Sequence, residues 1–494
     1  MSDLASIDAA VASIDEEITT IMERLAHLRR VREQLTEDKR MKKTLISPLR
    51  RLPTELVELF IHASLPEEWY THGSGRAVIP LAQVCYRLRA TALAMSDLWC
   101  KLTFPKKSHH EGALEKFFAY AECLLARACG RPVDLTMPEV SLTCCSDARV
   151  DRWVVTHMAR FRSIEWYPSR VTSGWPSSTL DAPSLESLRV IGNRDCYEDA
   201  PCPPNIGLNT PHLREFDLCW FASISRITVC WRTLQSLKIE TPSLDINDMH
   251  VLQDCTSLQT LELTLTTEPG AREMAAAAPI IFGFHALCHL TVVDYGHALC
   301  RHLFAPNLID ITMRSGCRVQ SKPAAHVLPV LDMLRSPSCP LPEVVTIDAY
   351  GRYNLDDEGP DYGEYLHVLA RIPELRCLKL VYSHTGACHL ESLLEGLVVK
   401  PDAPVLLPAL DHLALRLNGF RSFEDYDATQ MREIIRSRWE AARAGKGRPI
   451  TRLTLRTTAL TCRRVCRCAT NADWQKQLEA LGTVVDRTSC SDLP

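Results

Sequence analysis

The chain has 494 residues, 46% of them hydrophobic and 23% charged, which is the composition of a globular protein with a sizeable buried core. Its 56 basic and 60 acidic residues give a formal net charge of -4, which excludes overall electrostatic steering toward nucleic acid or an anionic membrane. The longest apolar run, Ala275 to Phe284, is far shorter than the roughly 20 residues that span a bilayer, so we expect no membrane segment. A protein is therefore the expected partner.

Residues 1–43 are predicted to form one long coiled-coil helix, because apolar residues recur there at alternating steps of four and three. The apolar seam must be buried against another surface, and homodimerisation through a parallel coiled coil is the preferred interpretation. Two alternatives remain open, an antiparallel return onto the body of the same chain and a helix that is frayed when alone. The seam consists of Ile7, Val11, Ile14, Ile18, Ile21, Leu25, Leu28 and Leu35, and Arg32 interrupts it.

Residues 47–105 are predicted to form a small all-α unit. Its first helix begins at Pro53, which suits a first helical turn because its missing N–H would have no partner there. Two apolar rows follow, which is more apolar surface than one buried face requires. We therefore expect one row to form the core and the other to contact a partner. The rows are Leu56, Leu59, Phe60 and Ala63 on one face, with Val57 and Ile61 beside it.

A second helical segment supplies the packing surface for the first. Leu81, Val84, Cys85 and Leu88 share one helical face, and Ser96-Asp97-Leu98-Trp99 follows as a capped turn with a large aromatic anchor. Together the two segments resemble an F-box, and more closely the F-box-like proteins that occur in many copies in mushroom-forming fungi. Two features depart from the family pattern, Leu88 where Trp is frequent and an inserted loop at residues 66–79.

The F-box resemblance implies binding to the Skp-type adaptor of Skp–cullin–F-box ubiquitin ligases. The residues that it assigns to the adaptor contact are Leu52, Pro53, Leu56, Val57, Phe60, Ile61, Val84 and Trp99. Trp99 serves equally well as internal core. The alternative is a helical subdomain without an outside partner. A connector helix is predicted within residues 106–131, where apolar residues recur at helical spacing from Leu114 to Ala128.

From residue 132 to residue 494 one pattern recurs, with apolar residues at i, i+3 and i+5. The last two residues of each triplet have the spacing of a strand, and the first forms a turn into it. Helical segments lie between some triplets, for example Leu390 to Leu397. The triplets begin at Phe161, Leu185, Leu213, Leu234, Leu258, Leu287, Leu308, Val344, Leu375, Leu410 and Ile450.

This pattern resembles the leucine-rich repeat family, which implies a solenoid with a parallel sheet on its concave side and a C-terminal cap. An ordinary α/β domain with similar leucine spacing is the alternative. The expected fold class is thus α/β, with a coiled-coil helix, an F-box-like unit and a repeat array in chain order. The acidic segment Tyr350 to Tyr362 is interpreted as a solvated loop or a loop at a recognition surface.

No motif in the sequence indicates catalysis. A phosphate-binding glycine motif, a nucleophile turn and an H-E-x-x-H pair are all lacking, and the cysteines at 144–145 and 462–468 lack the paired spacing of a zinc site. We expect no cofactor, no metal and no enzymatic activity. The 21 cysteines follow no disulfide framework, and no signal-peptide pattern is recognisable, which favours reduced thiols in the cytoplasm or nucleus.

The two resemblances together predict a non-catalytic substrate-recognition subunit of a ubiquitin ligase. The F-box-like helices would bind the adaptor, and the repeats would bind a protein substrate whose identity no motif reveals. The alternative is a structural scaffold in which the heptads mediate assembly.

Overall fold

The computed structural model describes residues 2–46, 52–65, 80–104, 113–137, 148–167, 179–192, 206–220, 223–242, 244, 246–266, 281–314, 329–330, 333–334, 342–349, 365–366, 369–383, 393–401, 403–418, 425–457, 476, 478–480 and 482–488. The chain forms two compact units. We call them the helical unit (Met1–Thr103 with Phe118–Arg131) and the sheet unit (Phe104–Phe117 with Pro132–Pro494). The predicted segments 66–79 and 350–362 and the cysteines at 144–145 and 462–468 lie outside the described residues.

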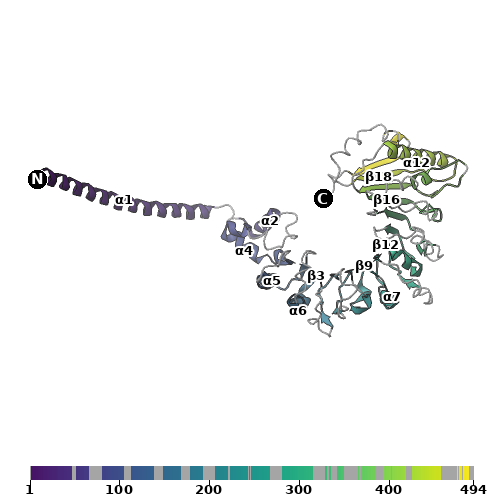
Figure 1. The fold of residues 1–494 in the computed structure, drawn as a ribbon, viewed down its shortest axis with the longest axis horizontal. Coiled ribbons are helices and arrows are strands. Elements are labelled where there is room, and N and C mark those ends of the chain that lie inside the picture. Colours follow the sequence, from purple (N-terminus) through teal and green to yellow (C-terminus); the bar gives the residue numbers. More distant parts are fainter. Residues whose placement is uncertain are drawn as a thin grey trace. The chain divides into compact units, whose positions relative to one another are not determined.

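The helical unit begins with the long helix α1 (Ser2–Ile46), as the heptads predicted (Figure 1). Next come α2 (Thr54–Ser64), a short helix at 80–84, α4 (Tyr86–Ala94), the 3₁₀ turn η2 (Ser96–Trp99) and strand β1 (Lys101–Thr103). The unit also contains most of α5 (Ala113–Arg127), which confirms the predicted helix at these residues.

Pro53 is the N-cap of α2, so the helix begins where the sequence predicted, and the Val57 N–H donates to the Pro53 carbonyl at 3.2 Å. The helix α2 packs on α4 through one face, and its other apolar row remains exposed. The Cys85 thiol caps α4 by accepting the Leu88 N–H at 3.4 Å. The core of this unit consists of Val57, Ile61, Leu65, Leu88, Ala92, Leu98, Trp99, Ala121, Leu124, Leu125 and Ala128.

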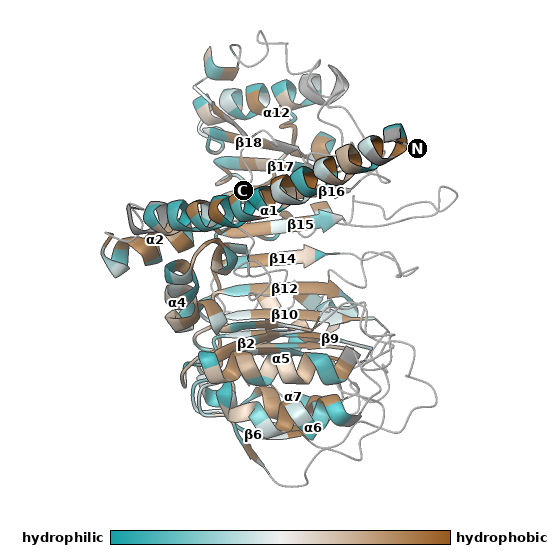
Figure 2. Ribbon diagram, turned by 90° about the vertical axis from the view of Figure 1, so that its left-hand side faces the viewer, coloured by the Kyte–Doolittle hydropathy of each residue, from teal (hydrophilic) through white to brown (hydrophobic). Residues whose placement is uncertain are grey.

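The sheet unit contains one long parallel sheet, in which each main strand pairs with the next main strand along the chain (Figures 1 and 2). Mixed α/β structure with a long parallel sheet is therefore confirmed. The strands, in order across the sheet, are β2 (Val133–Thr136), β3 (Phe161–Trp166), β5 (Ser187–Ile191), β7 (Glu215–Cys219), β9 (Ser236–Thr241), β10 (Thr260–Leu265), β12 (His289–Asp294), β14 (Asp310–Arg314), β15 (Val344–Ala349), β16 (Cys377–Ser383), β17 (His412–Asn418), β18 (Arg452–Thr457) and β19 (Val484–Thr488).

Short elements connect these strands. Two small parallel sheets are formed by β4 (Leu180–Asp181), β6 (Ile206–Asn209) and β8 (Ile227–Thr228), and by β11 (Phe282–Gly283) and β13 (Leu303–Phe304). The helices are α6 (Ala148–His157), α7 (Ile246–Leu252) and α12 (Asp425–Arg443), with 3₁₀ turns such as η8 (Trp231–Thr233) and η9 (Tyr295–His302). Of the predicted helix Leu390 to Leu397, residues 393–397 are helical and the earlier ones lie outside the described residues.

In most triplets the first residue closes a turn before its strand, which explains the i, i+3, i+5 spacing. The Leu213 N–H donates to Thr210, the Leu258 N–H to Cys255 and the Leu410 N–H to Leu407, at 3.0 to 3.3 Å. All three leucines are buried, as are the two inward residues of the strands that follow them. Buried positions align between neighbouring strands; Leu378 pairs with Leu413, and Leu380 with Leu415. The recurring apolar residues of the sequence therefore form rows of buried side chains that align from strand to strand.

Several strands differ from the prediction, and two of the main strands show why. The predicted triplet Val344, Ile347, Ala349 is displaced by two residues, because the inward pair aligned with Ile311 and Met313 is Val345 and Ile347. Val344 is β-branched and apolar like its neighbour, so hydrophobicity alone did not distinguish them. Strand β19 was not predicted, since its Val484 is 65% exposed and the segment lacks a leucine triplet.

The described cysteines are free thiols, and burial predicts which of them react. Burial raises the pKa of Cys255 and of Cys300 to about 12, whereas Cys123 and Cys129 are exposed. Because the thiolate is the reacting species, we expect iodoacetamide at pH 8 to modify Cys123 and Cys129 and to spare Cys255 and Cys300. Peptide mass spectrometry of the folded chain checks this, and rapid modification of Cys300 would contradict its placement in the core.

Candidate partner-binding surfaces

The helix α2 separates the predicted adaptor-binding residues into two groups. Leu56 and Phe60 are each 47% exposed, and Leu59 beside them is 64% exposed. Val57 and Ile61 on the opposite side are buried. We call Leu56, Leu59 and Phe60 the apolar face of α2. Exposed apolar side chains grouped on one helical turn are a feature of surfaces that contact another protein.

Three of the predicted contact residues belong to the core, and their assignment to a partner surface is corrected. Val57 and Ile61 pack inside the helical unit, as does Trp99. The Trp99 indole N–H donates to the Ala92 carbonyl at 3.0 Å, and the guanidinium of Arg127 lies 4.7 Å from the centroid of its ring. The amphipathic pattern of a short helix does not reveal which apolar row faces inward, because both rows have similar hydrophobicity.

The other predicted residues remain accessible. Pro53 is exposed, Val84 is 65% exposed, and Leu52 is half-buried with its carbonyl accepting a hydrogen bond from Arg87. At the other end of α2, His62 Nε2 lies 2.9 Å from Asp97 Oδ2, which connects the helix to the turn η2. These polar contacts hold the apolar face on a fixed helix.

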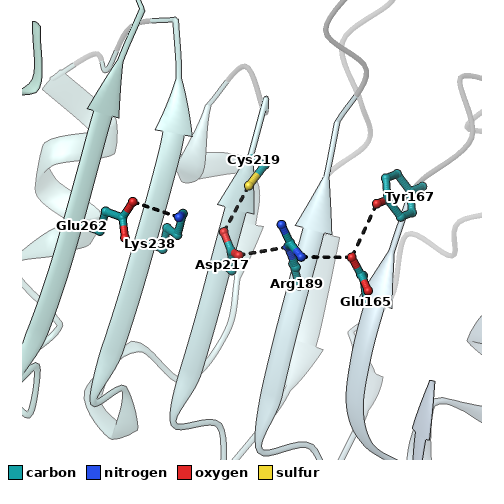
Figure 3. A network of polar contacts seen from close by, with 7 residues as sticks. All are labelled: Glu165, Tyr167, Arg189, Asp217, Cys219, Lys238 and Glu262. Atoms are coloured by element: carbon teal, nitrogen blue, oxygen red, sulfur yellow. Dashed lines mark hydrogen bonds and ion pairs between the residues drawn. The ribbon is translucent and has the colours of Figure 1, made fainter. Parts of the chain in front are cut away.

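The sheet unit carries polar side chains on one face of its long sheet. Between the buried residues of successive strands lie Glu165, Arg189, Asp217, Lys238 and Glu262, which occupy the same row of the register. We call these five residues the charge row (Figure 3). Their signs alternate from strand to strand, and cross-strand pairs of opposite charge stabilise a sheet.

Ion pairs connect the charge row across the strands. Arg189 lies between Glu165 at 3.1 Å and Asp217 at 3.0 Å, and Lys238 lies 2.9 Å from Glu262 (Figure 3). Partial burial acts to lower the pKa of Arg189, but Asp217 and Glu165 outweigh it and raise that pKa. Burial and the neighbouring Asp217 raise the pKa of Cys219 to about 12, so its thiol stays protonated and donates to Asp217 Oδ1 at 3.2 Å. The charges of the row are mutually satisfied, which indicates a structural role.

Farther along the same sheet, strands β14 to β18 line a hollow of 670 Å³. The hollow is bordered by Asp310, Thr312, Arg314, Thr346, Asp348, Lys379, Leu380, Val381, His412, Ala414, Leu415, Arg416, Arg452 and Thr454. Its guanidinium and ammonium groups outnumber its carboxylates. An excess of positive charge in a concave surface attracts anionic ligands.

The two ends of the hollow differ in chemistry. On β14 and β15, Arg314 Nε donates to Asp348 Oδ2 at 2.8 Å. The Oδ1 atoms of Asp310 and Asp348 are buried and have no hydrogen-bond partner among the described residues. On β17 and β18, Arg416 and Arg452 supply exposed positive charge. The exposed charge of the hollow is therefore positive and lies at the β17–β18 end, which suits a peptide with acidic side chains.

His412, which borders the hollow, contacts a cysteine that does not have the electrostatics of a nucleophile. Cys377 Sγ lies 3.3 Å from His412 Nδ1, and His412 Nε2 lies 3.0 Å from Thr454 Oγ1. Burial raises the pKa of Cys377, with Lys379 opposing and Asp310 reinforcing the shift. A nucleophilic cysteine requires a lowered pKa, so Cys377 stays a protonated thiol whose contact with His412 helps to orient the imidazole.

Neither the charge row nor the hollow was predicted from the sequence. Each residue of the charge row stands between the last two members of a triplet, so aligning the triplets would have placed the five charges in one row. The hollow had no comparable signal, since its polar residues come from three rows of the register. Among the described residues no group of metal-binding side chains is assembled, and none of the described helices has the length and hydropathy needed to cross a bilayer.

No protein-family model matches the chain, and no curated protein matches it either.

Proposed function

We propose that the protein is a non-catalytic substrate receptor of a Skp–cullin–F-box type ubiquitin ligase. In this proposal the helical unit is the F-box-like module and binds the Skp-type adaptor, while the sheet unit is a degenerate leucine-rich-repeat solenoid that binds a protein substrate. The receptor contributes proximity, because it raises the effective concentration of substrate lysines near the subunit that transfers ubiquitin. Such a receptor would work in the cytoplasm or the nucleus.

One observation supports the adaptor contact above all others. The helix α2 uses Val57 and Ile61 for the core yet leaves the apolar face of Leu56, Leu59 and Phe60 exposed. Burial of such side chains in a partner's groove provides most of the binding energy of a helix-in-groove interface. The contact residues that we now propose are Leu52, Pro53, Leu56, Leu59, Phe60 and Val84.

Binding to a purified Skp-type adaptor tests this proposal. We expect Leu59→Asp combined with Phe60→Asp to weaken adaptor binding by at least about 30-fold, because two desolvated apolar contacts would be replaced by charges. Both side chains are exposed, so the variant should keep its helix content in circular dichroism. Ile281→Asp is the matched control, since Ile281 is 66% exposed and lies in the sheet unit. A folded wild-type chain that ignores the adaptor in calorimetry would end the proposal.

The hollow supports the substrate-binding part of the proposal. Its cationic side chains outnumber its carboxylates, and Arg416 and Arg452 are exposed, which suits a protein segment rich in acidic side chains. The second candidate function is a structural scaffold, which the long exposed helix α1 favours because such a helix promotes assembly. Loss of adaptor binding with retained self-association would favour the scaffold.

A further inference from the structure

The helix α1 exposes its complete apolar seam. Exposure of the seam residues ranges from 41% at Leu25 to 62% at Leu35, Leu4 before them is 67% exposed, and no described residue of the helical unit covers the seam. Apolar residues alternate with polar ones along the helix (Figure 2). A seam of this length would bury about 50 Å of helix against a partner. Isolated apolar residues are ordinary on a surface, but a continuous heptad seam is the signature of a helix that pairs with another helix.

The seam by itself accommodates both orientations of a second copy. The a positions are Leu4, Val11, Ile18, Leu25 and Arg32, and the d positions are Ile7, Ile14, Ile21, Leu28 and Leu35. A parallel pair sets each residue against itself, so that Arg32 meets Arg32 of the second copy. An antiparallel pair sets a positions against d positions, so that Ile14 meets Leu25, Ile18 meets Ile21, and Arg32 meets Ile7. The other layers are apolar in both arrangements.

The charges of α1 are sharply divided between its halves. Residues 3–23 carry no basic side chain and six acidic ones, Asp3, Asp8, Asp15, Glu16, Glu17 and Glu23. Residues 24–42 carry seven basic side chains, Arg24, Arg29, Arg30, Arg32, Lys39, Arg40 and Lys42, against the acidic Glu33, Glu37 and Asp38. The helix macrodipole acts only within the terminal turns and does not require this division. An antiparallel pair places each acidic half beside a basic half.

The charges that flank the seam distinguish the two orientations. In a parallel pair, a g residue faces the e residue five positions later, so Asp3 meets Asp8 and Arg24 meets Arg29 of the second copy. These are like charges. In the antiparallel pair g faces g and e faces e.

In that antiparallel register Glu17 meets Arg24 of the second copy. Arg29 lies opposite the stretch between Asp8 and Asp15. Both contacts are attractive and each occurs twice in a dimer. Asp3 against Asp38 at the two ends is the one like-charge contact among residues 3–38 in this arrangement.

We propose that α1 binds a second copy of this chain in an antiparallel coiled coil centred between Thr19 and Thr20. This replaces the parallel pairing expected from the heptads and is independent of the proposed function. The two chains would leave α1 at opposite ends of the rod, about 80 Å apart, whereas a parallel pair would bring both helical units to one end.

A single charge reversal in the full-length chain has opposite consequences in the two orientations. Arg24→Glu sets a new carboxylate against Glu17 in the antiparallel dimer, so we expect its dissociation constant in sedimentation equilibrium to rise roughly tenfold. In a parallel dimer the same change sets that carboxylate against Arg29 and would tighten the dimer. Adding Glu17→Arg restores the antiparallel attraction and should return the wild-type value. The matched control is Arg30→Glu, which lies at the outermost f position and should change little.

A distance measurement on the otherwise unmodified chain decides the same question without weakening the dimer. A spin label at Thr36, attached through a genetically encoded non-cysteine side chain, should give an intermolecular distance of about 50 Å in the antiparallel pair and under about 25 Å in a parallel one. A label at Thr20, near the centre, should give a short distance in both. A short distance at Thr36, or a monomer at tens of micromolar, would overturn the proposal.

Discussion

Replacing Trp166 with alanine is expected to lower the free energy of unfolding by about 3–5 kcal/mol. Trp166 ends strand β3 and is one of the largest fully buried side chains. Its indole N–H donates to Asp151 Oδ1 of α6 at 3.1 Å, and Asp151 is itself buried. The substitution therefore removes a large apolar volume and also takes a hydrogen-bond donor from a buried carboxylate.

The conservative variant Trp166→Phe separates these two contributions. Phenylalanine retains most of the packing but cannot donate to Asp151, so we expect a loss of about 1–3 kcal/mol from the carboxylate alone. Chemical denaturation followed by circular dichroism measures both variants. A loss below about 1 kcal/mol for Trp166→Ala would contradict the burial of this side chain.

The set of strands that Trp166→Ala destabilises also tests the proposed solenoid. Each main strand pairs only with its sequence neighbours, so in a solenoid a defect at β3 should increase amide hydrogen exchange in β2, β3 and β5 and leave β17 unchanged. Leu415→Ala in β17 is the mirror-image control and should affect β16 to β18 alone. Uniform loosening of all strands by either variant would indicate one cooperative α/β core instead.

The parallel sheet could be predicted because the triplet reports a backbone requirement. The first residue, such as Leu258, closes a turn through its N–H, and the next two face inward on a strand, so three buried positions recur at fixed spacing. The same rule failed at β15, where Val344 and Val345 are adjacent and both apolar. Only the pairing of Val345 with Ile311 across the sheet selects the inward residue. Register between distant strands is a tertiary property that local hydrophobicity does not contain.

The candidate surfaces were less predictable for a related reason. A helix of 11 residues with apolar side chains at Leu56, Val57, Phe60 and Ile61 reveals that two faces exist but not which of them α4 covers. Trp99 was ambiguous because a large aromatic residue suits a core and an interface equally well. The hollow combines Asp310 with Arg452, which are far apart in sequence, and only the strand register brings them together.

Reversing the charge at one end of the hollow is expected to weaken the binding of acidic peptides strongly. The double variant Arg416→Glu, Arg452→Glu should weaken binding of a fluorescent poly-glutamate peptide roughly 100-fold, because attraction by two guanidinium groups becomes repulsion by two carboxylates. Lys379 on β16 lies between these arginines and the carboxylates of Asp310 and Asp348, and it keeps its positive charge in the double variant. Binding to the wild type should weaken with added salt, since the attracting charges are exposed.

Arg214→Glu combined with Arg232→Glu is the matched control for this experiment. Both arginines are exposed in the sheet unit outside the hollow, and the control changes the net charge by the same amount. Fluorescence anisotropy with poly-glutamate, and with poly-lysine as the opposite probe, measures all three proteins. If the control weakens poly-glutamate binding as much as the double variant, attraction depends on net charge and the hollow is not the binding site. A selective loss at Arg416 and Arg452 would instead define the segment by which a substrate is recognised, because charge complementarity within a concave surface gives specificity as well as a faster encounter.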